Sequence, residues 1–78
     1  MDIIKLADGI FFNKMKNIVF LNAGGDIIYY KKINNNFVCT GSKKHGKNIK
    51  ISDELYDIIS DKLYLAQQKL LEFKIAVQ

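Results

Sequence analysis

Residues 17–33 read NIVFLNAGGDIIYYKKI, and this stretch decides the fold. Its first part, 17–21, is an apolar run that is rich in β-forming residues and too short for a helix. The Gly24-Gly25 pair that follows supplies the positive φ angles of a tight hairpin turn. Residues 27–33 then alternate between two faces, as a second strand does. The stretch therefore predicts two antiparallel strands joined by a turn.

A third strand and a long helix complete the pattern. The asparagines at 34–36 tolerate left-handed conformations and predict a second turn, after which 37–40 form a third strand. From Ser52 onward apolar residues recur at spacings of three and four, which is the period of a helix. Ser52 is placed to cap this helix, which we expect to run from Asp53 to about Ala76. Its expected core positions are Tyr56, Ile59, Leu63, Ala66, Leu70, Phe73 and Val77, widened by Leu55, Ile58 and Leu65.

Residues 2–16 fit two structures. A helix is favoured by the spacing of five apolar residues, namely Ile3, Ala7, Ile10, Phe11 and Met15. Gly9 weakens a helix, and the apolar run at 10–12 fits a strand equally well. We favour a short helix and keep a strand as the alternative. The expected fold is α+β: a three- or four-stranded antiparallel meander packed against a long carboxy-terminal helix, in a single domain spanning 1–78.

Composition narrows the class of protein. The chain has 78 residues, of which 49% are apolar, and a net charge of +4. It has no apolar run of the roughly 18 residues that a membrane helix needs, and its acidic start at Asp2 is unlike a signal peptide. A single cysteine, Cys39, cannot form an internal disulfide, so we expect a cytoplasmic protein. All twelve cations are lysines, which attract anions with little geometric discrimination.

Residues 41–47 read GSKKHGK, which matches the phosphate-loop pattern G-x-x-x-x-G-K. Position 48 is Asn, however, where a phosphate loop needs a hydroxyl to hold magnesium. Residues 48–51 alternate like an extended segment, so the helix does not begin at the loop as a nucleotide site requires. We therefore expect a chance match and no cofactor.

The same loop, 41–50, concentrates positive charge and is a candidate for binding an anion or a partner. Its candidate residues are Lys43, Lys44, His45, Lys47 and Lys50, and Tyr30, Lys31 and Lys32 on the neighbouring strand are candidates for an added basic surface. Such a surface would bind nucleic acid with weak sequence specificity and strong dependence on salt. The alternatives are contact with an acidic protein, or a solvated loop that neutralises the acidic helix start.

The helix also carries apolar residues outside its core stripe. Tyr64, Leu71 and Ile75 lie together among polar residues, and the strand at 17–21 is apolar on both faces. Either residues 2–16 cover the second face of the sheet, or the excess apolar surface binds a partner or a second copy.

No catalytic constellation emerges from the sequence. His45 is the only histidine, with no acid beside it in the sequence to orient it, and Cys39 lies in a strand without a histidine partner. We expect a non-enzyme: a small regulatory or inhibitory protein that docks on another protein, or on itself as a homodimer. The abundance of Lys, Ile and Asn fits AT-rich coding, as in a phage, a mobile element or an AT-rich bacterium. A weakly specific nucleic-acid-binding protein that uses the lysine loop is the alternative.

Overall fold

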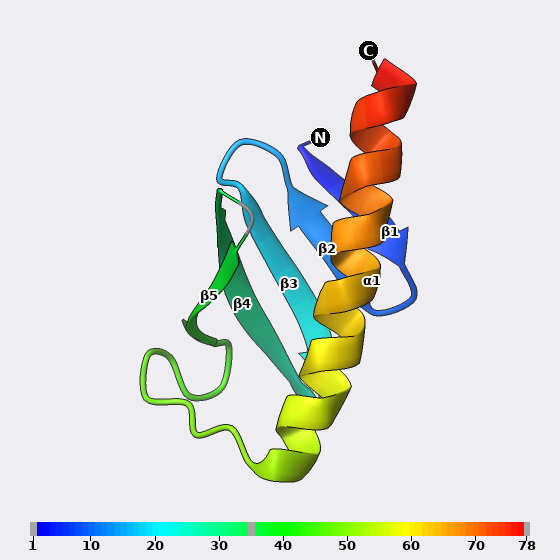
Figure 1. Ribbon diagram of the computed structural model, residues 1–78. Helices are drawn as coiled ribbons and strands as arrows, with labels where there is room; N and C mark the ends of the chain where they lie inside the picture. Colours follow the sequence, from blue (N-terminus) through cyan, green and yellow to red (C-terminus); the bar gives the residue numbers. More distant parts are fainter. Residues whose placement is uncertain (1, 35, 78) are drawn as a thin grey trace.

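The protein forms one antiparallel sheet with a single helix packed on one face (Figure 1). A computed structural model describes the backbone of residues 2–34 and 36–77, and the side chains of residues 2–34 and 36–72. Within these residues the elements are β1 (Ile3–Ala7), β2 (Ile10–Asn13), β3 (Ile18–Ala23), β4 (Asp26–Ile33), β5 (Asn36–Ser42) and α1 (Asp53–Val77). The strands neighbour one another in chain order, so the sheet is an open meander. The α+β class is confirmed, and the described strands number five rather than three or four.

The predicted turn between β3 and β4 is confirmed. Gly24 and Gly25 adopt φ angles of 59° and 76°, which side chains other than glycine or asparagine rarely tolerate. Asn34 begins the next turn with φ of 57°. Because these turns are short, they fix the register, which places Phe20 opposite Tyr29.

The preferred helix over residues 2–16 is wrong, because this segment forms the hairpin of β1 and β2. Gly9 makes the turn with φ of 71°. Ile10 and Phe12 point toward the helix and are buried, whereas Phe11 lies on the opposite face. This two-residue alternation matches the alternation of β3, so pairing with β3 outweighs the helical spacing.

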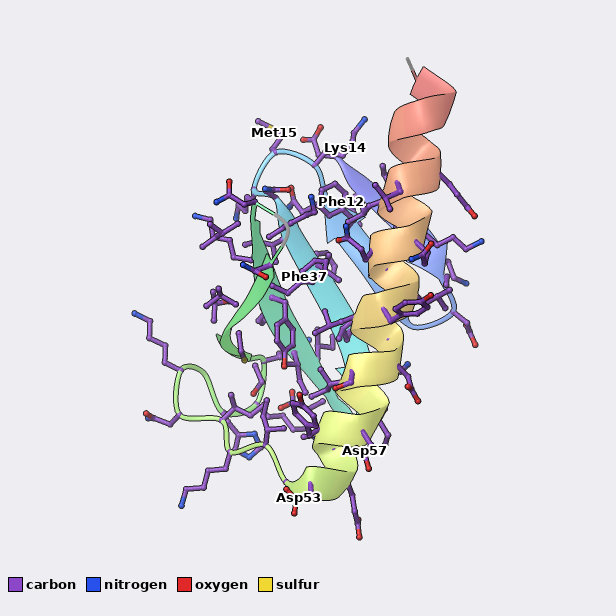
Figure 2. The ribbon with its side chains drawn as sticks, in the orientation of Figure 1. Phe12, Lys14, Met15, Phe37, Asp53 and Asp57 are labelled. Carbon is purple, nitrogen blue, oxygen red and sulfur yellow. The ribbon has the colours of Figure 1, made fainter. Side chains whose placement is uncertain are left out.

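The core lies between α1 and the alternate residues of the strands. Among the described side chains of the helix, the buried residues are Ile59, Ala66 and Leu70, and Ala66 is fully inaccessible. The strands contribute Ile10, Phe12, Val19, Leu21, Ala23, Ile28 and Tyr30. Figure 2 shows Phe12 and Phe37 directed into the space between sheet and helix. The helix is 25 residues long, or about 37 Å at the usual rise, so it runs the length of the molecule.

Ser52 caps the helix as predicted: its hydroxyl accepts from the Leu55 amide at 3.2 Å, and its carbonyl accepts from the Tyr56 amide at 2.8 Å. The predicted core stripe needs correction at its start, because Tyr56 is 62% exposed. Ile58 and Leu65 are exposed as well, since a single sheet covers only a narrow arc of the helix. The side chains of Phe73 and Val77 lie outside the described residues.

Within residues 2–34 and 36–77, no helical segment has the sustained hydropathy that crossing a bilayer requires.

Candidate functional site

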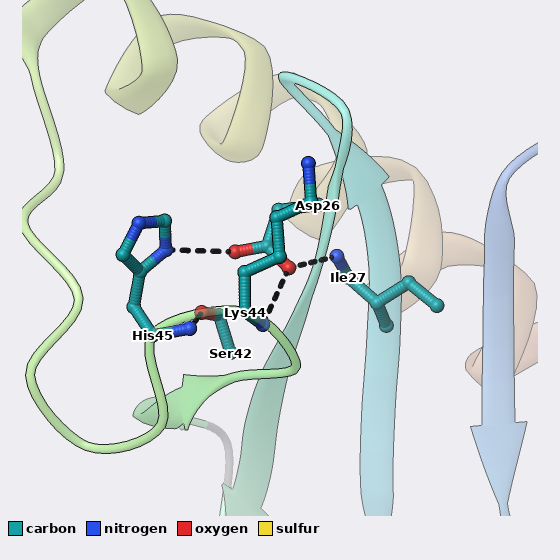
Figure 3. A network of polar contacts seen from close by, with 5 residues as sticks. All are labelled: Asp26, Ile27, Ser42, Lys44 and His45. Carbon is teal, nitrogen blue, oxygen red and sulfur yellow. Dashed lines mark hydrogen bonds and ion pairs between the residues drawn. The ribbon is translucent and has the colours of Figure 1, made fainter.

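The loop after β5 is organised around Asp26, at the start of β4 (Figure 3). One carboxylate oxygen of Asp26 accepts from the amides of Ile27 at 2.7 Å and Lys44 at 3.0 Å. The other oxygen lies 3.2 Å from Nδ1 of His45. Asp26 is only 9% exposed, so these contacts replace most of its water.

The hydrogen bonds keep this carboxylate charged. Burial by itself would raise the pKa of Asp26, but hydrogen bonds from Ser42, Lys44, His45 and Ile27 together lower it to about 2. Asp26 is therefore an anion at neutral pH. It holds the lysine-rich loop against the turn between β3 and β4.

This arrangement corrects the expectation that no acid orients His45. The side chain of His45 is 61% exposed, and its Nδ1 faces a carboxylate nineteen residues earlier in the chain. Nothing in the sequence marks this contact, because Asp26 has the position of an ordinary turn residue. Pairing of β4 with β5 brings the two together by placing Ser42 opposite Ile28.

The two glycines of the phosphate-loop pattern close the loop on itself. Ser42 and Gly46 exchange two backbone hydrogen bonds of 2.9 Å. Gly41 has φ of 137°, and a side chain there would collide with the carbonyl of Gly46. The spacing G-x-x-x-x-G thus serves a tight turn at the end of β5.

Three successive amides of this loop already have acceptors within the protein. Lys43 donates to the carbonyl of Ile27 at 2.8 Å, Lys44 to Asp26, and His45 to the hydroxyl of Ser42 at 2.9 Å. In a phosphate loop such amides surround the phosphate. Here α1 begins only at Asp53, as expected, and the anion within the loop is the protein's own carboxylate.

A cleft of about 390 Å³ lies between this loop, the β3–β4 turn and the start of α1. Ala23, Ile28 and Leu55 contribute apolar surface to it, and His45 and Asn48 contribute polar groups. Among the side chains that the structure describes, His, Cys, Asp and Glu nowhere gather in threes as a metal centre would require.

The structure does not assemble the added basic surface as predicted. Lys43, Lys44, Lys47 and Lys50 are all exposed on the loop. Tyr30, however, is buried in the core, where burial, followed by the neighbouring Cys39 thiol and Tyr56, raises its pKa to about 12. Tyr30 therefore cannot stack on a ligand at the surface.

Lys31 and Lys32 point to opposite faces of β4, at its far end from the lysine loop. Lys31 shares its face with Tyr29, whereas the half-buried Lys32 lies on the helix side. Lys43 follows β5 in the turn, and its amide donates to the carbonyl of Ile27, so Lys43 lies beside the first residues of β4.

We call the side of the sheet opposite α1 the open face, because no described element packs on it. Its centre is an aromatic row that crosses three neighbouring strands: Phe11, Phe20 and Tyr29. The ring centroids are 6.0 Å apart for the first pair and 6.1 Å for the second. All three side chains are half-buried.

Apolar residues surround this row, and a hollow lies beside it. The hollow measures about 280 Å³ and is lined by Ile3, Phe11, Phe20, Leu21, Asn22 and Ile27. The idea that residues 2–16 cover the second sheet face is wrong, since they add two strands, β1 and β2, to one edge of the sheet instead. Residues 10–12 are all apolar, so no alternation in the sequence marks Phe11 as the residue on this face.

On the outer side of α1, Tyr64 is 69% exposed and Leu71 is 46% exposed. The side chain of Ile75 lies outside the described residues. Their role as a partner or dimer surface stays a prediction.

Charge is divided between the two layers. Residues 1–50 hold nine lysines and three aspartates, whereas residues 51–78 hold three lysines and five acids. The sheet and its loops are thus basic, and the helix is acidic.

Comparison with known proteins found no family model, no curated sequence and no solved structure that matches this chain.

Proposed function

We propose that this protein is a non-enzymatic binding protein whose contact surface is the open face. The supporting observation is the aromatic row of Phe11, Phe20 and Tyr29, which crosses the middle of the sheet with no described element over it. Contiguous apolar surface on a small protein is characteristic of an interaction site. A row fixed by strand register is also preorganised, so little entropy is lost on binding.

The polar groups near His45 favour binding over catalysis, because they hold the loop in place. Both carboxylate oxygens of Asp26 accept hydrogen bonds that hold the loop. A protein that only binds acts in proportion to its amount, by covering a surface of its partner. A regulatory or inhibitory role fits this mode. The partner classes expected from the sequence were another protein, a second copy and nucleic acid.

Affinity capture with matched variants tests the surface. Phe20→Ser removes the middle ring of the row, and Tyr64→Ser removes an equally large aromatic from the outer side of the helix. We expect Phe20→Ser to lose the material that the wild type retains from lysate, while Tyr64→Ser keeps it. Circular dichroism checks that both variants are folded. Equal retention by Phe20→Ser and the wild type would contradict the proposal.

A further inference from the structure

We infer that the open face binds a single strand of nucleic acid, with bases against the aromatic row and phosphates beside the lysines at its border. This inference rests on the proposed function, because it names the ligand of the same surface. It departs from the protein partner that the sequence alone favoured, because rings and lysines lie together on this face.

The aromatic row suits separated bases. Phe11, Phe20 and Tyr29 lie directly opposite one another on three strands, and each presents part of its ring to solvent. Stacking on aromatic side chains tolerates any base, because every base has a π face. Successive bases of a duplex are about 3.4 Å apart and cover one another. The ring planes of Phe11 and Phe20 differ by 20°, whereas those of Phe20 and Tyr29 differ by 63°, so the row offers its rings one at a time, to bases that have been spread apart.

Lysines border this row on three sides. Lys5 lies opposite Phe11 on β1, Lys31 follows Tyr29 by two residues on the same face, and Lys43 lies beside Ile27. In a single strand the phosphates would contact the lysine ammonium groups, while the bases would lie on the apolar centre.

Acidic residues are absent from the strand positions of the open face. Asp26 is the only acid within the five described strands, and it is buried in the loop network. Asp8 in the β1–β2 turn lies 3.8 Å from Lys5, but both side chains are exposed and such pairs are weak. Lys5 therefore stays available to a phosphate.

The same charges disfavour a second copy as the occupant. Two open faces packed together would bring Lys5, Lys31 and Lys43 of one copy toward those of the other, and the exposed Asp8 beside Lys5 would offset only part of this repulsion. An intact duplex is also disfavoured, since its base faces are hidden within the stack.

The hollow beside the row is large enough to admit a base. Its 280 Å³ lies just below the range of about 300–1,000 Å³ that is usual for drug-sized ligands. Its wall is almost entirely apolar, which suits the face of a base rather than its polar edge.

Fluorescence anisotropy with labelled oligonucleotides tests the inference. The probes are thymidine and uridine homopolymers of about twelve nucleotides, within the site sizes known for single-strand binders, and a duplex of the same length. We expect both single strands to bind more tightly than the duplex, and their comparison separates DNA from RNA. Three phosphate contacts predict that affinity falls about twentyfold between about 50 and 200 mM salt.

Matched variants locate the contacts. Phe20→Leu keeps an apolar side chain but removes the ring, so stacking is lost while the fold and apolar docking are retained. We expect a loss of affinity between about 5-fold and 150-fold. Tyr64→Leu, on the helix, is the control and should bind as the wild type does. Lys31→Ala should reduce the steepness of the plot of log affinity against log salt concentration by about 0.7. Lys69→Ala has the same net charge as Lys31→Ala and should leave this slope unchanged.

Three results would overturn the inference: no binding of single strands at about 50 mM salt, equal affinity for the duplex, or wild-type affinity in Phe20→Leu. If the protein instead forms dimers that Phe20→Ser dissociates, the ligand is a second copy, and the proposed function survives without this inference. If neither oligonucleotides nor captured partners respond to any variant of the open face, both proposals fail.

Discussion

The two faces of β3 have nearly the same composition but different surroundings. Val19 and Leu21 are fully inaccessible beneath α1, whereas Ile18 and Phe20 are only half-buried on the open face. The difference comes from the cover: the one described helix packs on one side of the sheet. Apolar residues on a strand therefore do not by themselves report a core, and the uncovered half of this strand is the more informative about function.

The face of the sheet beneath α1 should contribute most of the folding stability, and the open face should contribute binding. Two neighbouring isoleucines of β4 test this division. Ile28 is fully inaccessible and Ile27 is half-buried on the other side. Ile28→Ala should lower the free energy of unfolding by about 2–5 kcal/mol, because it leaves a cavity under the helix. Ile27→Ala should cost roughly half of that or less. Urea unfolding measures both, and equal losses would show that the open face is covered in solution.

The loop that joins the sheet to α1 gives a second contrast, between two glycines with positive φ. Gly41→Ala should lower the free energy of unfolding by about 3 kcal/mol, because the new methyl group collides with the carbonyl of Gly46 and the backbone is strained as well. Gly46→Ala should cost about 1 kcal/mol, since its φ of 55° is strained but nothing lies within 4 Å. Thermal unfolding compares the two, and hydrogen exchange at the Lys44 amide reports whether the loop has opened. A smaller loss for Gly41→Ala than for Gly46→Ala would contradict the tight turn.

Acid should weaken the same loop through Asp26. Its pKa is lowered from 3.8 to about 2 in the folded protein, so the carboxylate contributes stability that is present above pH 4. That contribution is lost as the pH falls from about 4 through about 2. We expect Asp26→Asn to be less stable than the wild type at neutral pH, with the difference shrinking over this range. Denaturant unfolding at several pH values measures it, and a constant difference down to pH 2 would be inconsistent with the lowered pKa.

The outer side of the helix should show the smallest effect. Tyr64→Glu changes a side chain that is 69% exposed, so the free energy of unfolding should move by no more than about 0.5 kcal/mol. If the open face is the binding surface, light scattering should give the same mass for Tyr64→Glu, Leu71→Glu and the wild type. A wild-type dimer that either variant dissociates would assign the interface to the helix instead.

Local rules were enough for three features of the chain. The turn at Gly24 and Gly25, the cap at Ser52 and the helix from Asp53 follow from backbone preferences and hydrogen bonding within a few residues. The same rules were not enough for residues 2–16, where helical and strand spacings coincide. There the choice was made by pairing with β3, a partner that spacing alone does not identify.

By itself, then, the sequence determined an α+β domain, a meander, a long capped helix and a lysine-rich loop without the context of a phosphate site. Only the tertiary structure decided that Asp26 occupies that loop, that Tyr30 is buried, and that Phe11, Phe20 and Tyr29 form one row. These contacts join residues that are distant in the chain. They depend on strand register and on which face the helix covers, and both are set by the packing of the whole domain.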